Sequence, residues 1–271
     1  MAQPEHAVVA GVDGSGHSAE AAAWATREAR RRGARLHLVL VNDDPNRSAF
    51  AGKSVHAVAE QCRAQEPEVE VSEEVRTGHP IEQLLRCEET AQLMVLGSRG
   101  LGGFADALLG SVSSEVATHA AGPVVVVRGG GGDLGGPVVV GVDDAANAHA
   151  VLRFAFDAAA SRGVDVLAVQ AWHEQGLLAP PLPPPDQDEV QTRIENSLNA
   201  QLAEWRDRYP GLHARTRAVR GHPVPALVDA AGESPLLVVG HRGTGGFNGL
   251  FLGSVAVGVL HHARCPVAVV R

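Results

Sequence analysis

The chain has 271 residues, of which 45% are hydrophobic and 20% charged, and its mean hydropathy is −0.01. These values are typical of a soluble globular protein with one large or two small domains. The formal net charge of −8 argues against broad binding to nucleic acid or anionic lipid, both of which require a basic face. A small anionic ligand held by local donors stays compatible with this charge.

The location of the protein is inferred from what the sequence lacks. No apolar run is long enough to span a membrane, and the first residues lack the basic and apolar segments of a secretory signal. The three cysteines, Cys62, Cys87 and Cys265, show no CxxC spacing and are expected to be reduced thiols. We therefore expect a cytoplasmic protein.

The first half of the chain alternates short apolar strands with helices. We expect, in chain order, a strand over 7–12, a helix from Ser18 to Arg32, strands over 36–41 and 69–75, a helix after Pro80, a strand over 93–97, a helix over about 111–120 and a strand over 123–128. Gly33 fits the position that ends the first helix, and the buried face of that helix includes Ala22, Ala25 and Ala29. Continuous apolar strands separated by helices indicate a parallel sheet between two helical layers.

The second half of the chain repeats the first. Val8–Asp13 matches Val138–Asp143 with an offset of 130 residues. Further on, the Gly-His-Pro motifs, the glycine-rich loops and the apolar endings are offset by 143. The second copy therefore has 13 extra residues after its second strand, where the proline-rich stretch 179–185 lies.

The repeat predicts two tandem α/β domains, each a doubly wound parallel sheet with helices on both faces. The first spans residues 1–128 and the second spans 137–271. Residues 129–136 are mostly glycine, as in a flexible linker. Ligands of such sheets bind at the carboxyl ends of strands, where the strand order reverses.

A glycine-rich loop follows the fourth strand of each copy. Gly97-Ser98-Arg99-Gly100 is followed after nine residues by Gly110-Ser111, and the same spacing recurs from Gly240 to Ser254, with His241 in place of Ser98. Glycine lets backbone N–H groups approach an anion, and a helix N-terminus adds partial positive charge. A single copy is equally well explained by turn glycines and a helix cap. Recurrence in matching context favours a phosphate-binding loop.

Comparison of the two copies favours the first as the better equipped site. Asp13 and Asp143 end the first strand of each copy, either as ligand contacts or as turn residues before a helix. Ser113 and Ser114 of the first copy become alanine and valine in the second, which removes two hydroxyl groups. We expect the arginine inside each loop either to reach phosphate or to be solvated.

Two motifs imitate other nucleotide sites. Gly52-Lys53-Ser54 resembles the end of a P-loop, but Arg47 stands where a glycine is required. The string Gly14 to Ala19, with Asp43 and Asp44 after the second strand, resembles a dinucleotide fingerprint that the second copy does not keep. No motif of nucleophilic or metal-dependent catalysis is present, so no catalytic residues are assigned.

Taken together, these motifs resemble a tandem universal stress protein over nearly the whole chain. The resemblance is carried by Val-Gly-Val-Asp at the start of each copy (with Ala10 replacing the first valine), the Gly-His-Pro motifs, the paired loops and the Pro-Val-x-Val-Val-Arg-type endings. It implies a five-stranded parallel sheet per domain in the order 3-2-1-4-5, and ATP as the cofactor, with or without magnesium.

The resemblance also implies the site residues. Asp13, followed by Gly14 and Ser15, would contact ribose, and the backbone at Val41 would meet adenine. The phosphates would be surrounded by Gly97, Arg99, Gly100, Gly110, Ser111, Val112 and Ser113. The corresponding positions of the second copy are Asp143, Ala171, Gly240, Arg242, Gly243, Gly253, Ser254, Val255 and Ala256. There, Asp144 and Ala145 replace Gly14 and Ser15, and this puts an extra carboxylate near the phosphates.

The leading hypothesis is an ATP-binding regulatory protein of the stress response without efficient catalysis. The first alternative is a slow ATP hydrolase or nucleotide transferase. The second is a nucleotide-independent scaffold for dimerisation, in which the apolar fifth strands pair edge to edge, either between the two domains or between chains of a homo-oligomer. A downstream protein partner is expected but not identifiable.

Overall fold

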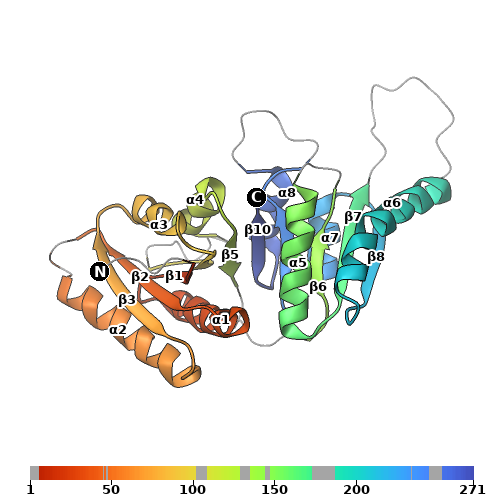
Figure 1. Ribbon diagram of the computed structural model, residues 1–271. Coiled ribbons are helices and arrows are strands. Elements are labelled where there is room, and N and C mark those ends of the chain that lie inside the picture. The colour runs from red at the N-terminus through yellow and green to blue at the C-terminus, as the bar shows by residue number, and fades with distance from the viewer. Residues whose placement is uncertain are drawn as a thin grey trace.

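The computed structural model describes residues 6–44, 46, 48–101, 109–128, 135–143, 147–172, 187–232, 234–243 and 252–271. Strands and helices alternate through both halves of the chain, as Figure 1 shows. The elements of the first half are β1 (Val8–Val12), α1 (Gly16–Arg32), β2 (Leu36–Asn42), α2 (Ser48–Gln65), β3 (Val71–Thr77), α3 (Pro80–Glu88), β4 (Leu93–Gly97), α4 (Ser111–His119) and β5 (Val124–Val127).

These bounds follow the sequence prediction with three differences. Strand β3 lies two residues later than the expected 69–75, because Val69 is part of a turn in which its amide donates to the Glu66 carbonyl at 3.0 Å. Helix α1 begins at Gly16 rather than Ser18, because Ser15 caps it by accepting a hydrogen bond from the Ser18 amide at 3.2 Å. Helix α2 lies in a segment where the sequence pattern predicts no helix or strand. Gly33 ends α1 with φ of 60°, the left-handed conformation expected of it.

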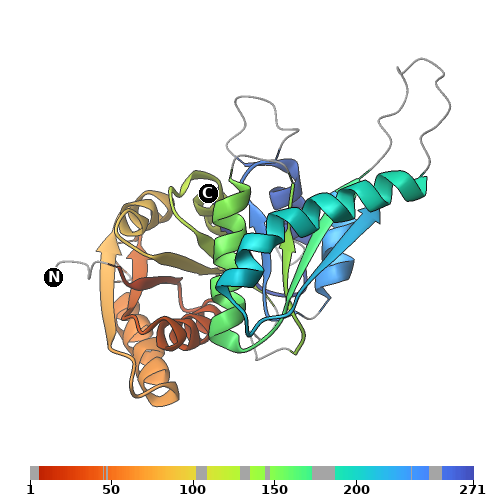
Figure 2. The same ribbon diagram turned by 45° about the vertical axis from the view of Figure 1, so that its right-hand side comes forward.

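The second half repeats this order. Its elements are β6 (Val138–Gly141), α5 (Ala148–Arg162), β7 (Val166–Trp172), α6 (Gln187–Arg208), β8 (Ala214–Arg220), α7 (Pro223–Ala231), β9 (Leu237–Gly240), α8 (Ser254–His262) and β10 (Val267–Val270). Figure 2 shows α6 running along β8 on the outer side of this half. The proline-rich stretch 179–185 and linker residues 129–134 lie outside the described residues.

All ten strands form one sheet in the order β3-β2-β1-β4-β5-β10-β9-β6-β7-β8. Each half has the 3-2-1-4-5 order implied by the resemblance, and its neighbouring strands are parallel. The halves meet through an antiparallel pair in which Val124–Val126 of β5 faces Val267–Val269 of β10. The expected pairing of fifth strands therefore occurs within the chain, and it occupies the edges that pairing between chains would need.

The sheet is covered on both faces, and each face has its own apolar core. Helices α1, α2, α5 and α6 cover one face, and α3, α4, α7 and α8 cover the other. Each core contains buried residues from both halves, including the expected Ala22, Ala25 and Ala29 of α1. The outer strands differ from this pattern, since β3 has Glu73 and Glu74 and β8 has Arg215 and Arg217.

A buried ion cluster joins the halves on the face of α1 and α5. Glu28 of α1 is 1% exposed and accepts hydrogen bonds from Arg32 at 2.6 Å and from Arg162 of α5 at 2.5 Å. Burial alone would raise the pKa of Glu28, but the two guanidinium groups outweigh burial and hold this pKa below its usual value. Glu28 is therefore ionised at neutral pH and is the counter-charge that two arginines, one from each half, share.

The arginines of this ion cluster occupy equivalent positions of the internal repeat. Arg32 lies over the ring of Phe154 at 5.2 Å from its centroid, and Arg162 lies over the ring of Trp24 at 5.6 Å. With the offset of 130 residues, the two arginines are equivalent positions, and so are the two aromatic residues. Each half thus places its arginine on the aromatic ring of the other.

On the opposite face, the last residue of each copy reaches a helix of the other copy. Arg128 follows β5 and donates to the carbonyl oxygens of His261 at 2.6 Å and Leu260 at 3.0 Å, at the end of α8. Arg271 follows β10 and donates to the carbonyl oxygen of Thr118, at the end of α4. A cation at a helix C-terminus satisfies carbonyl groups that lack intrahelical partners.

The three cysteines are buried thiols rather than disulfides. Burial raises the pKa of Cys87 and of Cys265 to about 11. None of the helices in the described part of the chain is both long and apolar enough to cross a membrane.

We predict that Glu28→Gln destabilises the protein by about 3 kcal/mol at pH 7, because it leaves two guanidinium groups at the interface without their counter-charge. The pKa of Glu28 is lower in the folded state, so its contribution is present above the unfolded-state pKa and is lost as pH falls through the folded-state value. The stability difference between wild type and variant should therefore shrink below about pH 4.

Urea denaturation at pH 7 and at pH 3 measures this difference. The matched control is Glu20→Gln on the same helix, where the carboxylate is 43% exposed and pairs with His17. This control should change stability by less than about 0.5 kcal/mol. A Glu28→Gln effect that is equal at both pH values would contradict the assignment of the interface to an ionised Glu28.

Candidate functional site

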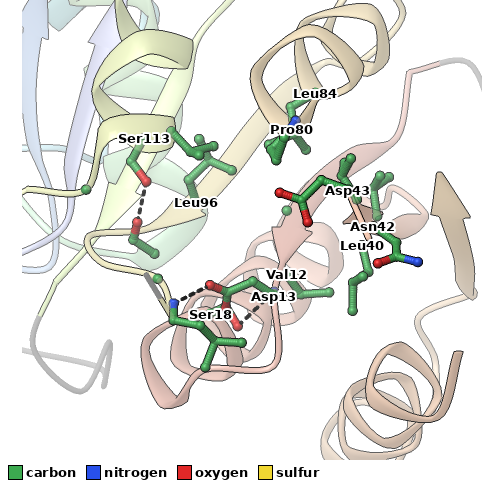
Figure 3. A pocket seen from close by; sticks show the side chains of 18 of the residues that line it. Val12, Asp13, Ser18, Leu40, Asn42, Asp43, Pro80, Leu84, Leu96 and Ser113 are labelled. Atoms are coloured by element: carbon green, nitrogen blue, oxygen red, sulfur yellow. Dashed lines mark hydrogen bonds between the residues drawn. The ribbon is translucent and has the colours of Figure 1, made fainter. Parts of the chain in front are cut away.

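A cavity of about 470 Å³ lies in the first half, at the carboxyl ends of β1, β2 and β4 (Figure 3). This is where strand order reverses, since β1 lies between β2 and β4. The cavity is lined by Gly11, Val12, Asp13, Ser18, Val39, Leu40, Val41, Asn42, Asp43, Phe50, Ala51, Pro80, Leu84, Leu96, Gly97, Arg99, Gly100, Leu101, Gly110, Ser111, Val112 and Ser113. Each phosphate, ribose and adenine position expected in the first copy is among them, except Gly14 and Ser15.

Asp13 connects the end of β1 to the glycine loop after β4. Its carboxylate accepts from the amide of Ser15 at 2.9 Å and from the amide of Leu101 at 2.8 Å. A Cβ on Gly100 would lie 2.5 Å from an Asp13 oxygen, so only glycine lets the loop approach this carboxylate. Burial raises the pKa of Asp13, but the hydrogen bonds from Ser15, Leu101 and Ser18 outweigh it and lower the pKa below its usual value.

Gly14 and Ser15 hold this arrangement from outside the cavity. Gly14 has φ of 88°, which makes the turn between β1 and α1. Ser15 caps α1, while its amide donates to Asp13. Both residues therefore orient Asp13, and their contact with a ligand, which the resemblance implies, stays a prediction.

The glycine loop brings the N-terminus of α4 to the cavity. Gly110 is the N-cap residue and donates its amide to the Ser98 carbonyl at 2.8 Å. No side chain caps this helix, in contrast to α1. Ser113 donates its hydroxyl to the Gly97 carbonyl at 2.6 Å and so ties the first turn of α4 to the end of β4. The first-turn amides of α4 thus face the cavity without a competing side-chain acceptor.

The sequence did not identify the rest of the cavity wall. Pro80 and Leu84 of α3 come from one side and Phe50 and Ala51 of α2 from another. Figure 3 shows the Asp43 carboxylate turned into the space between Pro80 and Asp13, while Asn42 turns toward α2, where its amide donates to Ser48 at 3.2 Å. Asp43 was noted in the sequence as part of a dinucleotide fingerprint; no sequence signal indicated α2.

The second copy keeps the same frame around its loop. Gly253 donates its amide to the His241 carbonyl at 2.7 Å, as Gly110 does to Ser98, and is the N-cap of α8, whose first residues are Ser254, Val255 and Ala256. A Cβ on Gly243 would lie 2.5 Å from an Asp143 oxygen. Ala171 lies on β7, Gly240 ends β9, and Arg242 follows in the loop.

One contact in the second copy has no counterpart among the described residues of the first. Asn147 stands where the first copy has His17, and its side-chain nitrogen lies 3.3 Å from Nδ1 of His241 and 2.8 Å from where a Cβ on Gly240 would be. Burial, followed by the charges of Arg271 and Arg242, lowers the pKa of His241. Asp144 and Ala145, which distinguish this copy in sequence, lie outside the described residues, as do 173–186 and 244–251.

Comparison with known proteins decides the family. The model of the universal stress protein family matches the chain twice, over residues 6–128 and 136–271. The chain belongs to this family. A universal stress protein of Mycobacterium tuberculosis is 35% identical, and the match covers 100% of this chain and 99% of that protein. Another, from Mycolicibacterium smegmatis, is 32% identical over 98% of this chain and 97% of its own.

Solved structures show the same fold for a tandem universal stress protein. A universal stress protein from Archaeoglobus fulgidus aligns with a TM-score of 0.67 at 20% identity, covering 98% of both chains. A putative universal stress protein from Pseudomonas aeruginosa aligns with a TM-score of 0.69 at 16% identity, covering 99% of this chain and 94% of that one. At these identities the likeness shows the fold alone.

Within the described part of this universal stress protein, no three His, Cys, Asp or Glu side chains gather as a metal site would require. The side chains at the cavity instead supply a carboxylate at Asp13, a guanidinium group at Arg99 and hydroxyl groups at Ser111 and Ser113.

We predict that Gly97→Ala destabilises the universal stress protein by about 2 kcal/mol, because the new methyl group would lie 2.7 Å from the backbone oxygen of His17 and force α1 away from β4. The control is Gly16→Ala at the exposed start of α1, where nothing lies within 4 Å of the new Cβ. That substitution should be neutral or stabilise by up to about 1 kcal/mol. Thermal denaturation compares the two, and equal stability would show that Gly97 is not under steric constraint.

Proposed function

We propose that this universal stress protein binds ATP in the cavity of its first half and acts as a stress-response regulator without efficient catalysis. The observation that carries the proposal is the junction of Asp13, the glycine loop and the N-terminus of α4 in one cavity. A cavity of about 470 Å³ lies within the range of small-molecule sites in proteins, about 300–1,000 Å³.

The phosphates occupy the end of the cavity at α4. First-turn amides of this helix and the hydroxyl group of Ser111 supply donors, and the helix dipole adds partial positive charge. Arg99 in the loop adds a full positive charge on the same wall. These local groups attract an anion even though the chain as a whole is acidic.

The ribose lies beside Asp13. The lowered pKa of Asp13 keeps its carboxylate ionised at neutral pH, so the group can only accept hydrogen bonds. Each oxygen already accepts one backbone amide, and a carboxylate oxygen can accept a further hydrogen bond from a ribose hydroxyl. These two amides fix the carboxylate before any ligand arrives, which reduces the entropy cost of binding.

The base lies between apolar walls on the far side of Asp13 from α4. Val39 and Leu84 come from the sheet and α3, and Phe50 comes from α2. Adenine stacks well against such surfaces, and the backbone at Val41 supplies the polar groups that orient it.

A regulatory role fits this site better than turnover. Among the described residues, the groups gathered at the phosphate end are donors, which stabilise bound phosphate and do not act as a base for an attacking water. ATP would act by shifting the protein between two states, to the extent that it binds one of them more tightly. Three buried thiols suit the cytoplasmic location proposed from the sequence.

The test is the identity and stoichiometry of the bound ligand. Freshly purified protein is denatured and any released ligand is identified by chromatography and mass, and titration calorimetry then measures ATP binding with magnesium. We expect one ATP per chain. Failure to bind at millimolar ATP would overturn the proposal, and two ATP per chain would show that the second copy binds equally.

Asp13→Asn and Asp143→Asn form a matched pair for this titration. Asp13→Asn removes the charged acceptor and should weaken ATP binding about tenfold or more. Asp143→Asn makes the same change at the equivalent position of the second copy and should leave affinity within about twofold of wild type. The reverse result would place the nucleotide in the second half.

A further inference from the structure

Helix α4 is short, and its two ends have different surroundings. It has nine residues, Ser111–His119. Ser111, Val112 and Ser113 at its N-terminus line the cavity. Thr118 in its last turn lies about 10 Å away along the helix axis, at the interface between the halves. A helix of this length has little stability of its own and depends on its anchors.

Two charged groups from other elements hold the C-terminal end of α4. Glu88, 5% exposed at the end of α3, accepts from the amides of Ala121 at 3.0 Å and Gly122, in the turn after the helix. Arg271, from the end of the second half, donates to the Thr118 carbonyl. Burial lowers the pKa of Arg271, and the nearby charge of Glu88 opposes that shift.

We infer that Arg271 is a positioning residue for the ATP site of the first half. The second half thereby completes a site to which it contributes no lining side chain among the described residues. Arg271 fixes the last turn of α4, while the Ser113 hydroxyl fixes its first turn against Gly97. With the far anchor lost, the first-turn amides no longer hold one direction toward the phosphates. This inference rests on the proposed function only for its ligand.

The internal repeat supplies a matched control. Arg128 occupies the position equivalent to Arg271 and holds α8 of the second half, through His261, which is equivalent to Thr118. Arg128→Gln and Arg271→Gln therefore remove the same group from the same interface, but from different helices. Burial, followed by the charge of Arg99, lowers the pKa of Arg128, so the loss of Arg128 also changes the charge near the cavity. That electrostatic effect weakens with salt, whereas a positional effect does not.

The first measurement is amide hydrogen exchange without nucleotide. Arg271→Gln should speed exchange about tenfold over residues 111–119 and leave residues 254–262 unchanged. Arg128→Gln should give the opposite pattern. Unchanged exchange over 111–119 in Arg271→Gln would overturn the inference, and so would equal acceleration of both helices in both variants. This readout is independent of ATP, so it tests the positioning even if the protein binds none.

The second measurement is ATP affinity by calorimetry at 50 and 300 mM NaCl. Arg271→Gln should weaken binding about tenfold at both salt concentrations, the loss expected when a pre-oriented donor set becomes mobile. Arg128→Gln should weaken it by no more than about twofold at 300 mM salt. Equal weakening by the two variants at 300 mM salt would assign the effect to a loosened interface and overturn the inference. Absence of ATP binding in the wild type would instead overturn the proposed function.

Discussion

Two guanidinium groups from different halves of the chain share one buried carboxylate at Glu28, and the joined sheet depends on this contact. A buried arginine without a counter-charge would cost more than the apolar packing around it provides. Two equivalent carboxylates would place like charges side by side, and the position equivalent to Glu28 is Ala158. The counter-charge at this pseudo-twofold interface therefore comes from one residue, Glu28, which has no equivalent carboxylate in the other half.

The proposed nucleotide site likewise combines contacts that both copies share with side chains that only one copy has. Backbone contacts are duplicated: the Gly110 and Gly253 amides bond to equivalent carbonyl oxygens, and Gly100 and Gly243 both touch an aspartate. The side chains that support these backbone contacts are not duplicated. Glu88, which anchors the turn after α4, corresponds to Ala231. The backbone frame of the loop needs only the shared residues, which leaves the side chains around it free to diverge between copies.

The sequence predicted what is local or repeated. Apolar runs located the strands, Gly33 ended the first helix in the left-handed conformation, and the matched loops indicated the cavity. Contacts between distant residues had no such signal. Arg162 meets Glu28 across 134 residues, and nothing in the spacing of either residue indicates the other. Helix α2 was missed as a wall of the cavity for the same reason, since Phe50 acquires its role only through packing.

The outer strands of the sheet carry a further consequence. The apolar strands β5 and β10 pair with each other, so neither is an open edge of the sheet. The two strands that remain at the edges carry charge of opposite sign: β3 has Glu73 and Glu74, and β8 has Arg215 and Arg217. Charged edge strands resist the addition of another chain. Because the two domains are parts of one polypeptide, the apolar edge strand of each is covered by the other within the same chain. This protection from aggregation therefore does not depend on protein concentration. The first half expressed alone would expose four consecutive valines, Val124–Val127, on an open edge.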